Sequence, residues 1–261
     1  MNVTAIVRAT WEWNASLVLL VLAAAALYLR RTRRDRSRAQ SCTFAGTCLV
    51  LILALSSPVN ALADGALFSD HMLQHLLLLV VVPALALWSL PRRMQGPAWT
   101  RSSLGPLGGW VSGIGAMYLW HVPALCDAAS ASSAIHVVQA ISLLAMGGAF
   151  WWPIFAPHEQ DRIPPWAGVG YLFAACLACS ALGILLTLTP IEVCPVFRAP
   201  VDRFALLPII RGTWGISAAR DRAVGGLLMW VPMCTVYGGA ILLELSRWYN
   251  PEPMGNTEAA R

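Results

Sequence analysis

The chain has 261 residues, of which 57% are hydrophobic and only 12% are charged. Soluble domains carry about 25% charged residues, so this composition excludes a water-soluble globular domain and indicates a membrane protein. The net charge of +5 comes from arginine alone, because the chain has no lysine. Six of the 18 arginines lie at positions 30–38, directly after an apolar run. This placement favours contact with anionic lipid over nucleic acid.

Seven apolar segments are long enough to cross a membrane as helices of about 20 residues. We predict spans at 13–30, 42–62, 71–90, 104–121, 134–153, 166–189 and 223–247. The positive cluster follows the first segment, the reverse of the order in a signal peptide, so we expect this segment to be retained. The expected fold is an all-α bundle of about seven transmembrane helices. It forms a single domain over 1–249, with a disordered tail over 250–261.

The arginines also predict an orientation in the membrane. With the N-terminus outside and the C-terminus in the cytoplasm, the inner segments hold 12 arginines and the outer segments hold six. Positive residues gather on the cytoplasmic side, so this orientation is favoured. The long loop at about 190–222 carries most of the outer arginines. We expect its stretch 196–216 to lie on the outer membrane interface, with a solvated loop as the alternative.

Four of the five histidines fall at the outer ends of predicted spans. His71 and His75 begin the third span, His121 ends the fourth and His136 begins the fifth. The spacing of four puts His71 and His75 on one helix face, as when one helix gives two ligands to a metal. His121 and His136 could close the same site, and imidazole suits copper, zinc, iron and nickel. For each histidine, the alternative is a hydrogen-bonded packing role.

Several functions based on histidine or on seven helices are disfavoured. A zinc protease needs a glutamate next to its first histidine as general base, and here Met72 takes that place. A retinal protein needs a lysine, which the chain lacks. A di-haem cytochrome needs histidine pairs from facing helices, and a transporter would show broken helices or repeats. Metal binding is therefore favoured over hydrolysis.

Further candidate ligands are predicted near the same membrane face. Met229 and Met233 are four residues apart in the last span, and thioether sulfur prefers Cu(I), although gap-filling in the core is the alternative. Asp70 or Asp127 could orient a ligating imidazole. For Asp70, capping of the following helix is the simpler role.

The cysteines give weaker indications. Cys176 and Cys179 form a C-x-x-C pattern in the middle of the sixth span, where packing is favoured over redox chemistry. Cys126 and Cys194 are both expected outside, where a disulfide can form. Their distance along the chain does not show whether they meet.

Five segments, spread over about residues 50–235, carry a resemblance to a known family. They are 56–62 (SSPVNAL), 67–87 (LFSDHMLQHLLLLVVVPALAL), 118–129 (YLWHVPALCDAA), 150–153 (FWWP) and 225–232 (GGLLMWVP). In this order they resemble the CtaG-type, or caa3-type, cytochrome c oxidase assembly factors. The resemblance implies a multi-pass protein of the bacterial inner membrane without turnover of its own. It also implies help in delivering or inserting copper into a haem–copper oxidase at the outer side.

The resemblance also implies partners and site residues. The partners would be cytochrome c oxidase subunits and membrane lipid, with a periplasmic copper carrier as a further candidate. The four outer histidines match family histidines, whereas Ala140 and Ala178 stand where family histidines are expected. The metal site is therefore expected to have fewer histidine ligands than in the family. A metal-independent scaffold for oxidase subunits, a metal-dependent membrane enzyme and a copper-uptake protein remain as alternatives.

Overall fold

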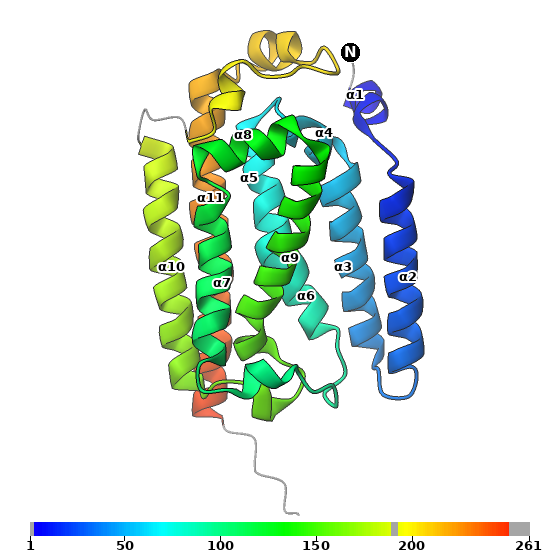
Figure 1. Cartoon of the computed structure of the whole chain (residues 1–261), viewed down its shortest axis with the longest axis vertical. Helices are drawn as coiled ribbons and strands as arrows, with labels where there is room; N and C mark the ends of the chain where they lie inside the picture. The colour runs from blue at the N-terminus through cyan, green and yellow to red at the C-terminus, as the bar shows by residue number, and fades with distance from the viewer. Residues whose placement is uncertain (1–2, 189–192, 251–261) are drawn as a thin grey trace, which may run out of the picture.

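The computed structural model describes residues 3–188 and 193–250 of the chain. In these ranges it contains helices and turns but no strand, which confirms the all-α prediction. Long helices lie side by side along the longest axis of the molecule (Figure 1). The tail that we predicted to be disordered, 250–261, lies outside the described residues except for Asn250.

Six helices in the described ranges are long and apolar enough to cross a membrane. They are α2 (Ala15–Thr32), α3 (Arg38–Ser56), the continuous helix of α5 (Phe68–Leu76), η1 (Leu77–Val81) and α6 (Val82–Trp88), α9 (Ser133–Phe155), α10 (Pro165–Leu188) and α11 (Ala218–Tyr249). The predicted span at 104–121 is α7 (Gly105–Leu119), whose 15 residues rise only about 22 Å, against roughly 30 Å of hydrocarbon. The structure therefore indicates a multi-pass membrane protein, but it does not confirm the count of seven.

The main packing partners are α10 with α11, α7 with α9, and α5 with α11. The crossing of α10 with α11, and that of α9 with η1, depend on glycine. A Cβ atom at Gly226 of α11 would collide with the hydroxyl of Thr187 in α10, and one at Gly147 of α9 would collide with the carbonyl oxygen of Leu79. Backbone therefore approaches its neighbour closely at these points.

The third span changes its pitch directly after the histidine pair. Pro83 has no N–H, so the Leu79 carbonyl cannot receive the hydrogen bond of a regular α-helix. Residues Leu77–Val81 widen into a π-turn, in which the Val82 N–H donates to the Leu77 carbonyl. Such turns often occur at functional sites. Here the π-turn separates α5, which carries His71 and His75, from the rest of the span.

The two ends of the bundle are built from different segments (Figure 1). The end at which α5 begins, called the histidine end here because His71 and His75 lie there, carries α1 (Val3–Thr10), α4 (Pro58–Ala63), α8 (Pro123–Ala131) and the segment 193–217. The arginine end carries the turn between α2 and α3, η2 (Ala98–Arg101), η3 (Glu159–Asp161) and the end of α11. The six clustered arginines at 30–38 therefore lie at the opposite end from His71, His75, His121 and His136 (Figure 1).

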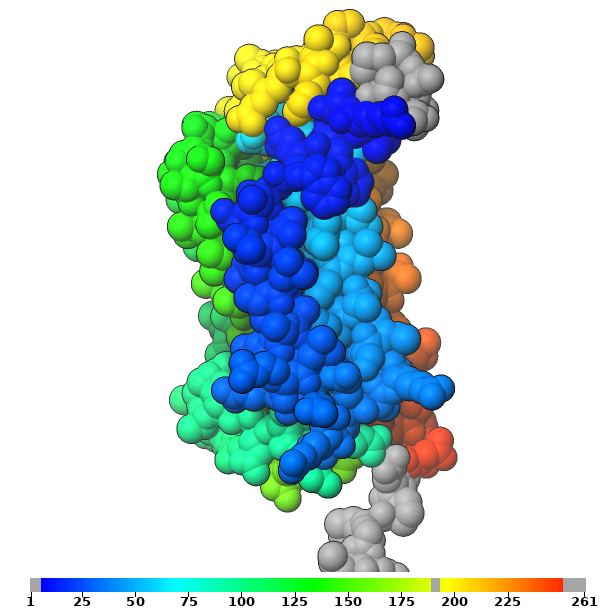
Figure 2. Space-filling model, turned by 90° about the vertical axis from the view of Figure 1, so that its right-hand side faces the viewer, coloured from blue at the N-terminus to red at the C-terminus, as the bar shows by residue number. Residues whose placement is uncertain are grey.

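The segment 196–216 folds over the histidine end. It contains η5 (Ile209–Thr213), and its Leu206 and Ile210 are buried with Ile6 and Leu67 in a small apolar cluster beside the main core. Figure 2 shows this segment, in yellow, above the blue N-terminal helices. Its position at the membrane interface stays a prediction, but the segment is packed on the protein rather than extended.

Candidate metal centre

Three histidines come together inside the histidine end. The ring centres of His71 and His75, both on α5, lie 4.5 Å apart, and the ring centre of His121 lies 5.3 Å from that of His75. Each of the three side chains is at most 4% exposed. The chain thus buries three imidazoles from two segments against one another.

Three of the six ring nitrogens of this cluster have no hydrogen-bond partner in the described structure. Nε2 of His71 and both ring nitrogens of His75 are buried without one in the described structure. Gln139 of α9 lies beside His75, but no hydrogen bond of ordinary geometry joins its amide nitrogen to the ring. An unpaired buried polar group costs about 1–3 kcal/mol, and a native structure that keeps one calls for an explanation. Nitrogens in this state are available to a metal.

His121 presents a nitrogen lone pair next to sulfur. It lies in the turn after α7, where its Nδ1 is hydrogen-bonded to the Met117 carbonyl. A carbonyl can only accept, so Nδ1 carries the proton and Nε2 keeps its lone pair. Nε2 lies 3.2 Å from the thioether sulfur of Met72 on α5. The pair places an imidazole next to a soft thioether, the first from the turn after α7 and the second from α5.

Met72 is a candidate ligand that the sequence prediction missed. The metal prediction rested on the helix face that carries His71 and His75, and on an ideal helix Met72 is turned about 100° away from His71. The side chain is nevertheless fully buried, on the side of α5 that faces His121. The only signal in the sequence was the His-Met pair itself.

His136 lies at the edge of the cluster and is already engaged. Its Nε2 is 3.0 Å from Oε1 of Gln74. The amide nitrogen of Gln74 donates to the carbonyl of Ala54 at 2.9 Å and to Oδ1 of Asn60 at 3.0 Å. This fixes Oε1 as an acceptor, so His136 donates to it through Nε2. His136 could reach a metal only through Nδ1 or by leaving Gln74.

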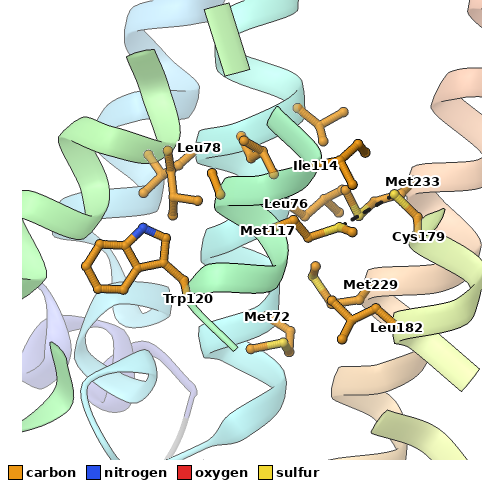
Figure 3. Close-up of a cluster of buried hydrophobic side chains, with 14 of the residues drawn as sticks. Met72, Leu76, Leu78, Ile114, Met117, Trp120, Cys179, Leu182, Met229 and Met233 are labelled. Carbon is orange, nitrogen blue, oxygen red and sulfur yellow. Dashed lines mark hydrogen bonds between the residues drawn. The ribbon is translucent and has the colours of Figure 1, made fainter. Parts of the chain in front are cut away.

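The predicted accessory methionines lie deeper in the same core. Met229 and Met233 of α11 are buried together with Met72, Met117 and Cys179. Figure 3 shows these sulfur-containing side chains gathered between α5, α7, α10 and α11, with Met117 and Cys179 joined by a contact of 3.6 Å between their sulfur atoms. Methionine packs readily in irregular cores, so this cluster also serves as ordinary apolar filling.

Asp70 does not cap the third span, which corrects our prediction. The helix begins at Phe68, so Asp70 falls within its first turn. Asp221 of α11 takes the capping role instead. Its carboxylate accepts hydrogen bonds from the N–H groups of Phe68 and Ser69, both at 3.0 Å, and from the Ser69 hydroxyl at 2.6 Å. A negative charge at a helix N-terminus is favourable, so Asp221 anchors the histidine-bearing helix to α11.

The cysteines at this end are joined. Cys126 of α8 and Cys194 form a disulfide, with their Cα atoms 5.6 Å apart. The neighbouring Asp127 accepts a hydrogen bond from the N–H of Val196 at 2.9 Å. The partner of this carboxylate is therefore a loop amide, and both contacts fasten the segment after α10 to α8. That segment places Phe197 with its ring centre 5.6 Å from that of His71.

A cavity of about 130 Å³ opens beside the cluster. Phe68, Phe197, Cys194 and Asp221 contribute to its lining. Because Phe197 contacts His71 on one side and lines the cavity on the other, it forms the wall between the cavity and the imidazoles.

The C-x-x-C pattern in α10 does not bring its two thiols together. The sulfur of Cys176 lies 2.8 Å from that of Cys234 on α11, whereas Cys179 faces Met117 and Tyr237. Both cysteines take part in helix packing, as the sequence favoured.

The two positions that lack the expected histidines also serve packing. Ala140 is buried in the core on α9. The carbonyl of Ala178 accepts a hydrogen bond from the hydroxyl of Tyr118 at 2.8 Å.

The imidazole and thioether donors of the cluster fit a soft metal ion with a low coordination number. No group of three or more His, Cys, Asp or Glu side chains in the described ranges converges as a preformed metal site would. The cluster offers imidazoles with unpartnered nitrogens and one imidazole next to a thioether. Carboxylates, which harder cations prefer, are not among the donors of this cluster. Imidazole and thioether together suit Cu(I).

Comparison with known proteins identifies the family. The model of the cytochrome c oxidase caa3 assembly factor family (Caa3_CtaG) matches residues 20–251, from within α2 to just past α11. No curated protein and no solved structure matches the chain. The family match covers most of the chain and includes every residue of the histidine cluster. The chain therefore belongs to the cytochrome c oxidase caa3 assembly factor family.

Proposed function

We propose that this assembly factor holds Cu(I) transiently at its histidine end and passes it to the oxidase as the copper centre is built. The observation that carries the proposal is the cluster of His71, His75 and His121, with unpartnered buried nitrogens and the thioether of Met72 alongside. Copper is cargo in this proposal, and the protein performs no turnover of its own.

The small donor set suits a carrier that must release its metal. A preformed site with three or four converging ligands would bind copper tightly and release it slowly. Here His71 and His75 offer nitrogens from one helix face, and the pair of His121 and Met72 offers a second contact point. An oxidase subunit or a periplasmic copper carrier could supply the remaining ligands and withdraw the ion.

The proposal places the histidine end outside the cytoplasm of a bacterial cell, with the N-terminus outside and the C-terminus inside. Two observations support this orientation. The disulfide between Cys126 and Cys194 lies at the histidine end, and disulfides persist in oxidising compartments. The six-arginine cluster at 30–38 lies at the opposite end, as expected for a cytoplasmic face.

Copper loading of the purified protein tests the proposal. The full chain would be purified in detergent, loaded with Cu(I) under an inert atmosphere and desalted, and its copper measured by mass spectrometry. We expect about one copper per chain in the wild type and a loss of at least about tenfold in the His71→Ala, His75→Ala double variant. His158→Ala, which removes the one histidine that does not lie at the histidine end, is the matched control. Equal copper in all three proteins would overturn the proposal.

A metal-independent scaffold for oxidase subunits is the second candidate. One observation favours it: in the described ranges, no group of three or more His, Cys, Asp or Glu side chains is arranged to hold a metal ion. Oxidase activity and copper content in cells separate the two candidates. A variant with His71, His75, His121 and His136 all replaced by alanine, normally inserted in the membrane, would still support oxidase assembly if the scaffold is correct.

A further inference from the structure

A second cavity, of about 880 Å³, opens at the arginine end. It lies between the start of α3, the end of α6 and the segment that follows α9. Its volume falls within the roughly 300–1,000 Å³ of typical small-molecule sites. No residue of the histidine cluster lines it, so it is independent of the copper proposal.

One wall of this cavity is apolar and aromatic. Leu85, Leu87 and Trp88 from α6 line it together with Phe155 at the end of α9. The rings of Trp88 and Phe155 are stacked, with centres 5.3 Å apart and planes 9° from parallel. Trp88 is 56% exposed at the end of its helix, the position that tryptophan takes at the edge of a bilayer. The wall is therefore suited to contact the acyl chain of a lipid close to its headgroup.

The lining of the cavity is also positively charged. Arg92, Arg93 and Arg162 line it, and the carboxylate in its lining is that of Asp35. Asp35 pairs with Arg93 at 3.4 Å, and both side chains are exposed, so this pair is weak. The lining keeps a net charge of about +2, since three guanidinium groups face one carboxylate.

The arginines around Arg162 repel one another. Burial lowers the pKa of the Arg162 guanidinium, and the charges of Arg247 and Arg92 lower it further, while Glu159 and Glu244 oppose them. The Nε–H of Arg162 donates to the carbonyl of Ala156 at 2.6 Å. A bound anion would relieve this repulsion through the terminal nitrogens of the guanidinium.

We propose that this cavity binds one anionic phospholipid. Its phosphate lies against Arg92, Arg93 and Arg162, and one acyl chain lies along Trp88 and Phe155. Basic pockets between membrane helices on the cytoplasmic side are suited to such headgroups. Inorganic phosphate would satisfy the arginines, but it would leave the apolar wall without a partner. The bound lipid fastens the first cytoplasmic turn to the ends of α6 and α9.

Native mass spectrometry of the full chain tests the proposal. Delipidated protein would be titrated with phosphatidylglycerol, with phosphatidylcholine of the same chains, and with inorganic phosphate. We expect the protein to retain one phosphatidylglycerol and to retain phosphatidylcholine much more weakly. Inorganic phosphate at the same concentration as the lipid should not displace the bound phosphatidylglycerol. In Arg92→Gln, Arg93→Gln, affinity for phosphatidylglycerol falls roughly 30-fold, the equivalent of about 1 kcal/mol per arginine.

Two further variants separate a built site from general surface charge. Arg33→Gln, Arg34→Gln removes the same charge from the neighbouring turn without touching the lining, so it keeps the wild-type affinity within about threefold. Thr43→Phe keeps every arginine but narrows the cavity, and it weakens retention as strongly as the loss of Arg92 and Arg93. Equal retention of the two lipids, equal losses in the two arginine variants, or full displacement by phosphate would each overturn the proposal.

Discussion

Buried carboxylates at the arginine end lie against partners that match them, whereas the histidine end buries rings without partners. Asp161 accepts hydrogen bonds from the Gly96 N–H at 2.8 Å and from Nε of Arg101 at 3.1 Å. Glu244 accepts two hydrogen bonds from Arg247, at 2.7 and 2.8 Å. Each of these two buried carboxylates is therefore compensated inside the protein.

At the histidine end, three nitrogens of His71 and His75 are buried without any such compensation in the described structure. The strong contacts there surround the cluster instead: Asp221 holds the start of α5, and the disulfide holds the segment that carries Phe197. We call the Asp221 contacts and the disulfide the frame of the cluster. The difference indicates that the frame stabilises this end, while the unpaired nitrogens of the cluster lower its stability. Unpaired groups of this kind are expected where function requires them.

Loss of the Asp221 cap should have the largest effect on this frame. Asp221→Ala removes three hydrogen bonds to a carboxylate and the ion pair of that carboxylate with Arg211, which is 3.7 Å away. We expect a loss of about 3–5 kcal/mol in the free energy of unfolding, measured by thermal unfolding in detergent.

Asp70→Ala is the matched control for this change, because Asp70 is a carboxylate in the first turn of the same helix. Its replacement should cost less than about 1 kcal/mol. If the two variants lost the same stability, the cap would contribute nothing specific and α5 would be held by apolar packing alone.

Opening the disulfide should have the next largest effect. Cys126→Ser together with Cys194→Ser removes a link between positions 68 residues apart, and we expect a loss of about 2–4 kcal/mol. A reductant should lower the melting temperature of the wild type but not that of the double variant. Cys176→Ser with Cys234→Ser provides a comparison within the membrane core, where both thiols are free. If reductant did not change the melting temperature of the wild type, the disulfide would not contribute to the frame as proposed.

Replacing a histidine of the cluster should act in the opposite direction. His75→Leu removes two unpaired nitrogens and fills the space with carbon, so we expect the copper-free protein to gain about 1–2 kcal/mol while copper binding falls. Gln74→Leu, one position away, should instead destabilise by about 1–3 kcal/mol, because Asn60 and His136 lose their partner. Destabilisation by both changes would show that the ring of His75 is satisfied in the folded protein.

The sequence predicted the helices well because span length is a local property. Each of the seven predicted segments overlaps a helix, and six of them overlap one that is long enough to cross a membrane, but the helix ends differ from the predicted ones. The segment 42–62 breaks after Ser56 into the short α4, since Pro58 cannot continue the hydrogen bonding of α3. In contrast, 223–247 extends to Ala218–Tyr249, because a helix can continue into water after its apolar run has ended.

The site was predicted less completely, since its decisive contacts join distant parts of the chain. The spacing of His71 and His75 was visible, but the contact of Met72 with His121 joins residues 49 apart. The contact of Asp221 with α5 joins residues about 150 apart, which no periodicity indicates. The sequence therefore pointed to Asp70, the nearest carboxylate, where the structure uses Asp221.

The smallest effect is expected from acid at the arginine end. Burial raises the pKa of Asp161, but the hydrogen bonds from Gly96 and Arg101 and the charge of Arg101 outweigh it, so the pKa lies below its ordinary value. A carboxylate whose pKa is lowered by folding adds stability above its unfolded pKa of about 3.9, and this stability is lost as the pH falls through the folded value.

Asp161→Asn should therefore cost about 1 kcal/mol at pH 7 and progressively less below about pH 4, where the wild type loses the same contribution. Melting temperatures of both proteins between pH 7 and pH 3 measure this convergence. Asp35→Asn, which breaks the exposed pair with Arg93, should cost less than about 0.5 kcal/mol at pH 7. A gap between wild type and Asp161→Asn that stayed constant down to pH 3 would mean that the carboxylate acts through shape rather than charge. The buried charges of the arginine end would then be no better compensated than the imidazoles at the other end.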